Sequence, residues 1–160
     1  MKKIFIALLL SAVSLGASAQ FEKGTKYVGA SVSGFGLSYS KIPGFCLDLQ
    51  AIGGYFISDG IMLLGQFGWE HRPHENDFDL GIAGRYYLQD NGLYFNGGFK
   101  YEHVGPHVKS DNFYLTPEVG YCFYLNDHVS IEPAVYCDMC LNHFKNFTKI
   151  GLKIGFGYYF

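Results

Sequence analysis

Charged residues are scarce in this sequence of 160 residues, and long apolar runs are scarcer still. Only 16% of the residues are Asp, Glu, Lys or Arg, and the formal net charge is −2. Beyond the N-terminal segment, no stretch reaches the roughly 20 apolar residues that a membrane-spanning helix needs, which excludes a helical membrane protein. Linkers, low-complexity tracts and blocks of like charge are also missing, so we expect one domain and no nucleic-acid partner.

The N-terminal segment has the composition of a secretory signal peptide. Lys2 and Lys3 precede an apolar run over residues 4–15, which gives way to Ala-Ser-Ala ending at Ala19. This order predicts cleavage between Ala19 and Gln20. An N-terminal membrane anchor is the alternative, but the run is too short to span a bilayer. No cysteine directly follows the site, which argues against a lipoprotein. The expected units are a signal peptide at 1–19 and one exported domain at 20–160.

Aromatic residues and glycine are plentiful, with 15 Phe, 13 Tyr and 21 Gly. From residue 45 onward, apolar residues alternate with polar or small ones at a period of two, which marks β-strands with one apolar face. The run over 26–38 also alternates but changes phase near Gly34, where we expect a bulge. Each run is about as long as a tilted membrane strand. The eight predicted strands are 26–38, 45–58, 61–70, 78–89, 93–102, 113–125, 129–139 and 149–160.

Short and long connections alternate along the chain. Residues 58–60, 90–92 and 126–128 read Ser-Asp-Gly, Asp-Asn-Gly and Asn-Asp-His. Gly, Asn and Asp tolerate the positive φ of tight turns. Short turns at one end and longer loops at the other are typical of outer-membrane barrels, whose turns are periplasmic and whose loops lie outside. The predicted loops are 39–44, 71–77, 103–112 and 141–146.

The apolar face of the predicted strands is sorted by height, with aromatic residues near both ends and aliphatic residues between. Two such girdles indicate membrane interfaces, whereas the core of a soluble sandwich has no reason to sort its side chains this way. We therefore predict an all-β fold, an eight-stranded antiparallel up-and-down transmembrane β-barrel. The girdles are Tyr55, Tyr86, Phe95, Phe123, Tyr158 and Phe160 near the turns, and Phe45, Trp69, Phe78, Tyr101 and Phe113 near the loops.

The opposite face of the predicted strands carries charges at middle depth. An eight-stranded barrel has an interior just wide enough for side chains, and buried charges need partners. We expect an interior ion-pair network in which Lys100 and Glu118 lie at similar height on neighbouring strands. Ordinary charges in a water-filled lumen are the alternative. The network residues are Arg85, Lys100, Glu118, Glu132 and Lys153.

The last strand ends on an aromatic residue. Phe156, Tyr158 and Phe160 resemble the signal that outer-membrane proteins present to the barrel-assembly machinery. With Gly-Tyr-Phe-Ile-Ser-Asp at 54–59 and the strand-turn-strand repeat, residues 26–160 resemble the small outer-membrane β-barrel family that includes OmpX and the membrane domain of OmpA. The resemblance implies an integral protein of the Gram-negative outer membrane. Its partners would be outer-membrane lipids, periplasmic chaperones and the assembly machinery. The predicted loops are shorter than in several relatives, so we carry over no adhesion or ligand function.

Two groups of residues in the predicted loops could support chemistry: five histidines with nearby carboxylates, and a smaller group around Ser110. Imidazole and carboxylate groups can together hold Zn²⁺ or Cu²⁺, but the spacing is not compact, and loops also simply collect polar residues. Ser110-Asp111, near His103 and His107, has the residue types of a lipid-modifying enzyme, although its signal is weak. We expect no enzyme and no cofactor. The five histidines predicted in loops are His71, His74, His103, His107 and His143.

The four cysteines form no disulfide framework. Cys137 and Cys140 are three apart on one predicted strand, so they point to opposite faces and cannot bridge. Cys46 and Cys140 both lie near the loop end. For these two, a bridge across the lumen and a pair of plain small side chains remain the alternatives.

Together these features predict an integral outer-membrane barrel with a structural or surface-interaction role and a packed polar interior. A narrow or gated channel for small solutes, as in OmpW-like proteins, is the alternative. The sequence identifies no ligand or transported solute.

Overall fold

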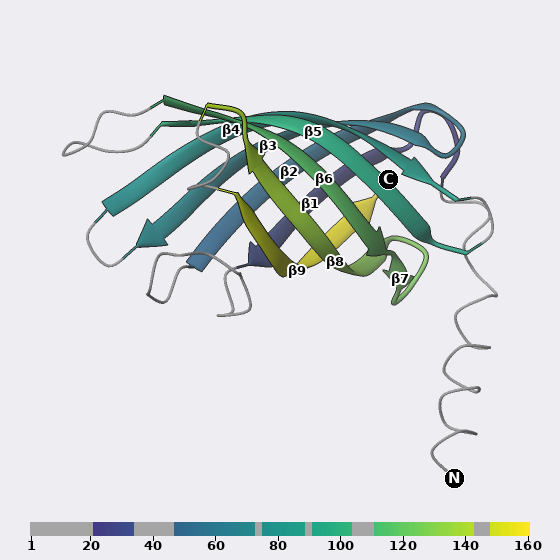
Figure 1. Ribbon diagram of the computed structural model, residues 1–160. Coiled ribbons are helices and arrows are strands. Elements are labelled where there is room, and N and C mark those ends of the chain that lie inside the picture. Colours follow the sequence, from purple (N-terminus) through teal and green to yellow (C-terminus); the bar gives the residue numbers. More distant parts are fainter. Residues whose placement is uncertain (1–20, 34–46, 73–74, 89–90, 104–110, 143–147) are drawn as a thin grey trace, which may run out of the picture.

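Figure 1 shows the computed structural model, which describes residues 21–33, 47–72, 75–88, 91–103, 111–142 and 148–160. Ala19, Gln20 and the bulge expected near Gly34 lie outside the described residues. Among the residues described, no helix is long and apolar enough to cross a membrane. The strands are β1 (Lys26–Ser33), β2 (Leu47–Ser58), β3 (Ile61–Arg72), β4 (Glu75–Tyr87), β5 (Leu93–His103), β6 (Asp111–Tyr121), β7 (Phe123–Tyr124), β8 (Val129–Cys140) and β9 (Lys149–Tyr159).

The strands form one closed antiparallel barrel in which each strand pairs with its neighbours in the sequence. β1 pairs with both β2 and β9, so the first and last strands complete the ring. β6 and β7 are two parts of one strand, interrupted at Cys122, and both pair with β8 in a single register. The predicted eight-stranded up-and-down β-barrel is therefore confirmed.

Glycines with positive φ make two of the tight turns. Gly60, between β2 and β3, and Gly92, between β4 and β5, both have a φ of 73°. A Cβ is unfavourable in this left-handed region. At Gly92 it would also lie 2.7 Å from the carbonyl oxygen of Cys122. In the third turn, between β7 and β8, Asn126 Oδ1 accepts a hydrogen bond of 2.9 Å from the N–H of His128. The tight turns predicted at 58–60 and 126–128 are thus confirmed, and Gly92 has the backbone conformation expected for the one predicted at 90–92, whose Asp90 lies outside the described residues.

The predicted loop at 71–77 is wrong, because the β3–β4 hairpin continues through most of it. Arg72 and Glu75 face each other at the end of the backbone ladder. The alternation of apolar residues ends before this point, but backbone hydrogen bonds between strands do not require apolar side chains. His71 therefore lies in β3, and His103 is the last residue of β5, so neither belongs to a loop.

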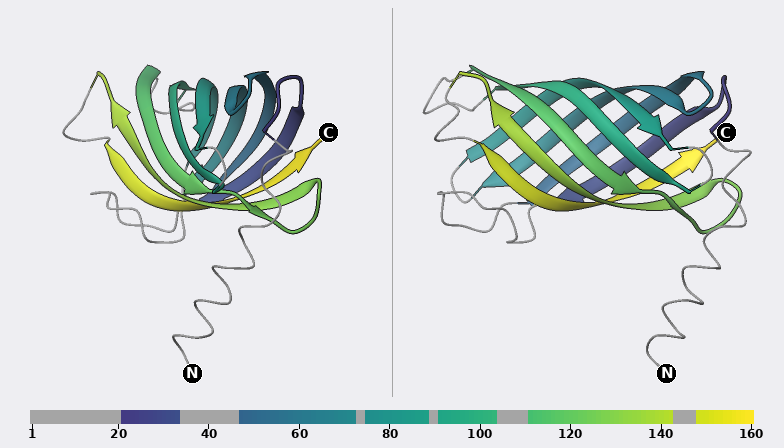
Figure 2. Two further views of the ribbon diagram at one scale, coloured as in Figure 1. Left: turned by 90° about the vertical axis from the view of Figure 1, so that its right-hand side faces the viewer. Right: turned by 45° about the vertical axis from the view of Figure 1, so that its right-hand side comes forward.

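The strands are inclined to the barrel axis, as the right-hand view in Figure 2 shows. The register of the ladders shows the same tilt. A path that steps from each residue to its ladder partner on the next strand begins at the loop end of β1 and finishes beside the β4–β5 turn, at the opposite end of the barrel. Neighbours in the ladder therefore change height steadily around a closed barrel. The path runs through Ser33, Lys153, Ala134, Gly120, Tyr94 and Tyr87.

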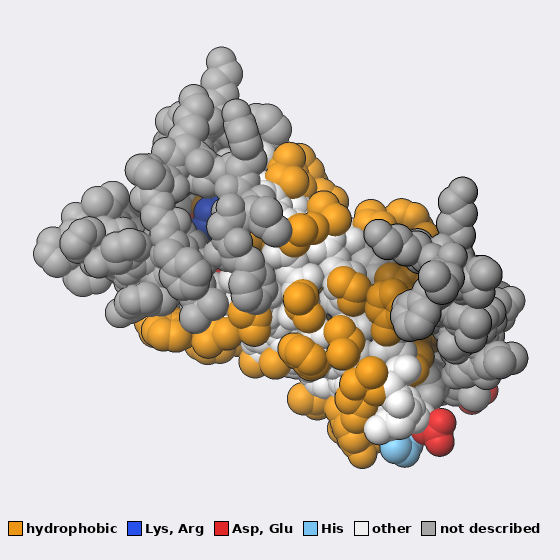
Figure 3. Space-filling view, turned by 90° about the horizontal axis from the view of Figure 1, so that it is seen from below, with side chains coloured by type: hydrophobic (Ala, Val, Ile, Leu, Met, Phe, Trp, Pro, Cys, Tyr) orange, Lys and Arg blue, Asp and Glu red, His pale blue; other side chains and the backbone are white. Residues whose placement is uncertain are grey.

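The outer wall of the barrel is apolar. Exposed and buried residues alternate along β5 and β9, and outward-facing Leu80 and Ile82 are 60% and 66% exposed. On the face shown in Figure 3, hydrophobic side chains cover the wall between the two ends, and the charged side chains in view lie near the ends. The predicted girdle residues stand on this wall, except Phe45, which lies outside the described residues. Phe67 and Phe99, near the middle of β3 and β5, interrupt the expected aliphatic band.

Candidate functional site: the charged interior of the barrel

Inward-pointing side chains fill the barrel with charge. The five charged residues predicted for the interior all point inward and are buried, and Arg85 and Glu132 are each only 2% exposed. Charges removed from water in this way need oppositely charged or hydrogen-bonding partners. They come from five strands: Arg85 from β4, Lys100 from β5, Glu118 from β6, Glu132 from β8 and Lys153 from β9.

Arg85 and Glu132 form a hydrogen-bonded ion pair across the lumen. Arg85 Nη1 lies 2.7 Å from Glu132 Oε2, which also accepts a hydrogen bond of 3.1 Å from the Tyr27 hydroxyl. The other oxygen, Oε1, accepts hydrogen bonds from Ser130 Oγ at 2.8 Å and from the Tyr159 hydroxyl at 2.7 Å. Both carboxylate oxygens are thus satisfied, which favours a buried ion pair, whereas Arg85 Nε has no hydrogen-bond partner among the described residues.

Tyrosine side chains surround the Arg85 guanidinium. Its Nη1 donates a hydrogen bond of 3.0 Å to the Tyr87 hydroxyl. Its Cζ lies 4.2 Å from the ring centre of Tyr94 and 5.5 Å from that of Tyr27. A guanidinium suits this position because it is planar and weakly hydrated and interacts favourably with aromatic faces.

Glu118 connects this pair to Lys153. Lys153 Nζ lies 2.5 Å from Glu118 Oε2, and Arg85 Nη2 lies 4.0 Å from Glu118 Oε1. The Tyr94 hydroxyl and Asn96 Nδ2 donate further hydrogen bonds to the same carboxylate at 3.0 and 3.2 Å. Four of the five predicted residues therefore lie in one group, in which two cations balance two carboxylates.

Lys100 lies outside this group. Its Nζ is 2.7 Å from Asp138 Oδ2 on β8 and 5.2 Å from the ring centre of Tyr114. The expected placement of Lys100 beside Glu118 is wrong, because Lys100 pairs in the ladder with Tyr114 and Glu118 pairs with Asn96. Strand tilt is the cause. In a tilted barrel, two residues that are equally far along the chain from two different tight turns do not lie at equal heights on neighbouring strands.

Asp138 is the partner that the sequence reasoning missed. Alternation within the strand predicted at 129–139 already places Asp138 on the inward face, between outward-facing Cys137 and Met139. The missing information was its height relative to Lys100, which lies two strands away around the closed barrel. Alternation along one strand gives no such information.

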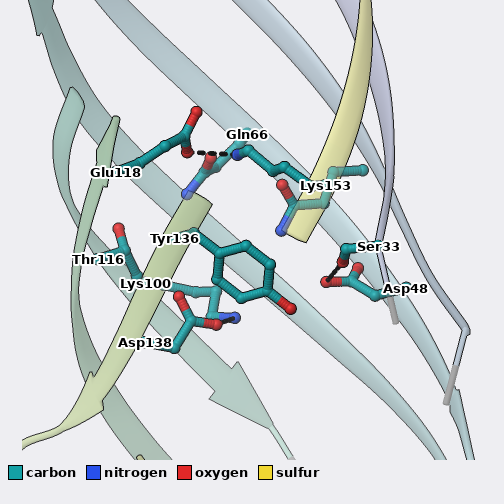
Figure 4. Close-up of a pocket in the computed structure, with 10 residues that line it drawn as sticks. Ser33, Asp48, Gln66, Lys100, Thr116, Glu118, Tyr136, Asp138 and Lys153 are labelled. Atoms are coloured by element: carbon teal, nitrogen blue, oxygen red, sulfur yellow. Dashed lines mark hydrogen bonds and ion pairs between the residues drawn. The ribbon is translucent and has the colours of Figure 1, made fainter. Parts of the chain in front are cut away.

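A small cavity lies between the two sets of charges. Its volume is about 20 Å³, which is room for about one water molecule. Figure 4 shows Lys153 directed at Glu118 and, lower in the view, Lys100 beside Asp138. The buried hydroxyl of Thr116 lines the cavity and has no hydrogen-bond partner among the described residues. The lumen at this level is therefore packed with side chains.

Solved structures share this architecture, although no family model and no curated protein matches the sequence. The N-terminal β-barrel domain of Pseudomonas aeruginosa OprF matches with a TM-score of 0.69 and 13% identity, over 86% of this chain and 98% of that chain. Neisserial surface protein A matches with a TM-score of 0.60 and 13% identity, over 85% and 96%. Ail, the attachment invasion locus protein of Yersinia pestis, gives 0.53 and 12%, over 86% and 99%. The chain has the fold of the small outer-membrane β-barrels.

Of the candidate catalytic and metal-binding residues, the structure describes the side chains of His103 and Asp111. His103 Nδ1 lies 2.9 Å from Asp111 Oδ1, between the end of β5 and the start of β6, and both side chains are exposed. Within the part of the chain that the structure describes, no cluster of His, Cys, Asp or Glu is arranged to hold a metal ion. His74, His107, His143, Ser110 and the side chain of His71 lie outside the described residues.

Three of the four cysteines lie in the described part of the barrel as free thiols. Cys122 and Cys140 are buried on the inward face, whereas Cys137 is half-buried on the outward face. Cys137 and Cys140 thus point to opposite faces, as predicted. Cys46, the other half of the bridge considered for Cys140, lies outside the described residues.

Proposed function

We propose that the chain is an integral barrel of a Gram-negative outer membrane, with a structural or surface-interaction role and an interior packed too tightly to conduct solutes. One combination of features carries the proposal: an apolar wall encloses buried, paired charges and a cavity of only about 20 Å³. Such a wall is suited to lipid, because contiguous apolar surface of this kind is unfavourable in water. We assign the chain no catalytic activity and no cofactor.

The same proposal fixes an orientation and a set of partners. The tight turns lie on the periplasmic side and the longer connections lie outside, as is usual for barrels of this type. Phe156 and Tyr158 on the outward face of β9, and Phe160 directly after that strand, are exposed. They are available to the barrel-assembly machinery before β9 pairs with β1. Periplasmic chaperones would act before assembly, and outer-membrane lipids would contact the finished wall.

Membrane integration is tested by the solution behaviour of the processed chain. The expected result is a folded β-sheet protein that stays monodisperse in detergent micelles and aggregates when detergent is removed. Circular dichroism and size-exclusion chromatography measure both properties. A monodisperse folded species in detergent-free buffer contradicts the membrane assignment.

Conductance in planar bilayers separates the structural role from the narrow channel. The folded protein is expected to insert without discrete current steps, because side chains fill the lumen between the ion pairs. Protein unfolded by heat before addition controls for nonspecific leakage of the bilayer. Reproducible unitary steps from the folded protein alone would show instead that the chain is a channel for small solutes.

A further inference from the structure

Aromatic rings close the lumen at the end where the tight turns lie. We use the term aromatic floor for Phe56, Tyr87, Tyr124 and Tyr159, which come from β2, β4, β7 and β9. Phe56 and Tyr87 are fully buried, with an exposed fraction of 0%. The rings of Phe56 and Tyr87 have centres 5.6 Å apart, and those of Tyr124 and Tyr159 have centres 5.3 Å apart. Phe56 and Tyr159, at 6.4 Å, link the two pairs. The floor is therefore a continuous layer across the barrel.

Phe21 is seated against this floor although it precedes the first strand. Its ring stacks on Tyr87 with centres 4.1 Å apart and an interplanar angle of 22°. Tyr124, Phe56 and Tyr159 follow at 5.8, 6.1 and 6.5 Å. Only 7% of Phe21 is exposed, whereas the following residue, Glu22, is exposed.

Backbone hydrogen bonds hold the residues around Phe21 to the β2–β3 hairpin. The N–H of Gly60 donates to the Phe21 carbonyl oxygen at 2.8 Å, and the N–H of Lys23 donates to Asp59 Oδ1 at 2.8 Å. The N–H of Gly24 donates to the Phe56 carbonyl oxygen at 3.0 Å. Gly24 has a φ of 97°, which allows the sharp bend before β1. Residues 21–24, which we name the strap, are thus attached at three points.

The floor separates the strap from the Arg85–Glu132 ion pair. The hydroxyls of Tyr87 and Tyr159 lie 3.0 Å apart and contact the pair, Tyr87 accepting from Arg85 and Tyr159 donating to Glu132. Their rings lie against Phe21. Water that reached this layer would compete for these hydrogen bonds and weaken the ion pair by raising the local dielectric.

We propose that Phe21 is a stopper for the turn end of the lumen and that the strap is a latch which holds it in place. When the strap detaches from the β2–β3 turn, water gains access to the aromatic floor and the ion pair above it. This inference goes beyond the proposed function and does not depend on it, because the contacts are internal to the folded chain. The strand alternation gives no sign of this role, since it begins only at β1.

Cys122 provides a built-in reporter for this proposal. Its Sγ is buried beside the floor, 3.5 Å from the Tyr159 hydroxyl and 3.8 Å from Glu132 Oε1. The experiment measures how fast a charged, water-soluble maleimide labels Cys122 in the folded protein in detergent micelles. The parent protein carries Cys46→Ser, Cys137→Ser and Cys140→Ala, so that only this thiol reacts. Protein unfolded in urea gives the labelling rate of the unprotected thiol.

Phe21→Ala is expected to raise the labelling rate by about tenfold to a hundredfold, the change that losing one buried aromatic side chain makes in a local opening equilibrium. Phe21→Leu should lie between Ala and the parent. Glu22→Ala is the matched control in the same segment and should label at the parent rate. Equal rates for Phe21→Ala and the parent, with the barrel still folded by circular dichroism, overturn the proposal, as does an equal increase in Glu22→Ala.

A second variant tests the latch without touching the floor. Asp59→Ala removes the acceptor for the Lys23 N–H and should raise the labelling rate by a smaller factor. It should also speed hydrogen exchange of the Tyr87 N–H, which is bonded to the Gly60 carbonyl oxygen at 2.7 Å. If Phe21→Ala does not fold, Asp59→Ala alone tests the proposal. A labelling rate of Cys122 and a hydrogen-exchange rate of the Tyr87 N–H that both equal those of the parent protein refute the latch.

Discussion

Replacing Glu132 by alanine is the sharpest test of the interior ion pairs. The substitution removes the partner of Arg85 at 2.7 Å and the acceptor for Tyr27, Ser130 and Tyr159. All of these groups are buried, so bulk water cannot replace the lost carboxylate. Removing one partner of a buried pair typically costs about 3–5 kcal/mol, because the other charge is left uncompensated.

The arrangement around Arg85 places the expected cost near the lower end of that range. Glu118 remains 4.0 Å from Arg85 Nη2 and supplies part of the missing negative charge. We therefore expect Glu132→Ala to lower the free energy of unfolding by about 3 kcal/mol. Adding Arg85→Met removes the unpaired cation, so the double variant should be more stable than Glu132→Ala alone.

Urea unfolding in detergent micelles measures these effects, with the fluorescence of Trp69, the single tryptophan, as the signal. With a slope of about 2 kcal/mol/M, a loss of 3 kcal/mol lowers the midpoint by about 1.5 M. Exposed Glu22→Ala is the control and should leave the midpoint unchanged. A midpoint shift for Glu132→Ala of less than about 0.5 M would falsify the view that Arg85 is cut off from water.

Three further substitutions test other parts of the structure by urea titration, in detergent micelles for Asp138→Ala and Gly92→Ala and in lipid vesicles for Leu80→Arg. Asp138→Ala leaves Lys100 without its partner at 2.7 Å and should cost about 3 kcal/mol; an unchanged midpoint would mean that Lys100 is solvated. Leu80→Arg places a charge on the apolar wall and should cost about 2–4 kcal/mol in lipid vesicles, a penalty that a water-facing wall would not show. Gly92→Ala forces a Cβ into a turn with a φ of 73° and should cost at least about 1 kcal/mol, unless the turn rearranges.

Strand alternation was enough to predict the fold and the contents of the interior. It assigns Arg85 and Glu132 to the inward face of their strands, and a closed barrel of eight strands then forces both into the same narrow lumen. Gly60 and Gly92 mark the turns because few other residues tolerate their backbone conformation. These features depend on short-range order along the chain, which a sequence displays directly.

The partners within the interior were beyond such reasoning. The choice of Asp138 over Glu118 for Lys100 depends on the stagger between strands, and the stagger is set by all the ladders around the ring together. The position of Phe21 was equally hidden, because a single aromatic residue before the first strand has no period. The polar sequence near His71 concealed the extension of β3, since backbone hydrogen bonds between strands do not depend on which side chains the strands carry.

The interior ion pairs also constrain the order of events during folding. Arg85 and Glu132 are 47 residues apart, and Lys100 and Asp138 are 38 apart. Two strands, β5 and the strand formed by β6 and β7, stand between Arg85 on β4 and Glu132 on β8, whereas only the second of them stands between Lys100 and Asp138. Neutralisation of Arg85 by Glu132 is thus coupled to the curling step that precedes ring closure. A chain that stalls short of that step retains unpaired charges, which keeps the half-rolled sheet from settling into hydrocarbon.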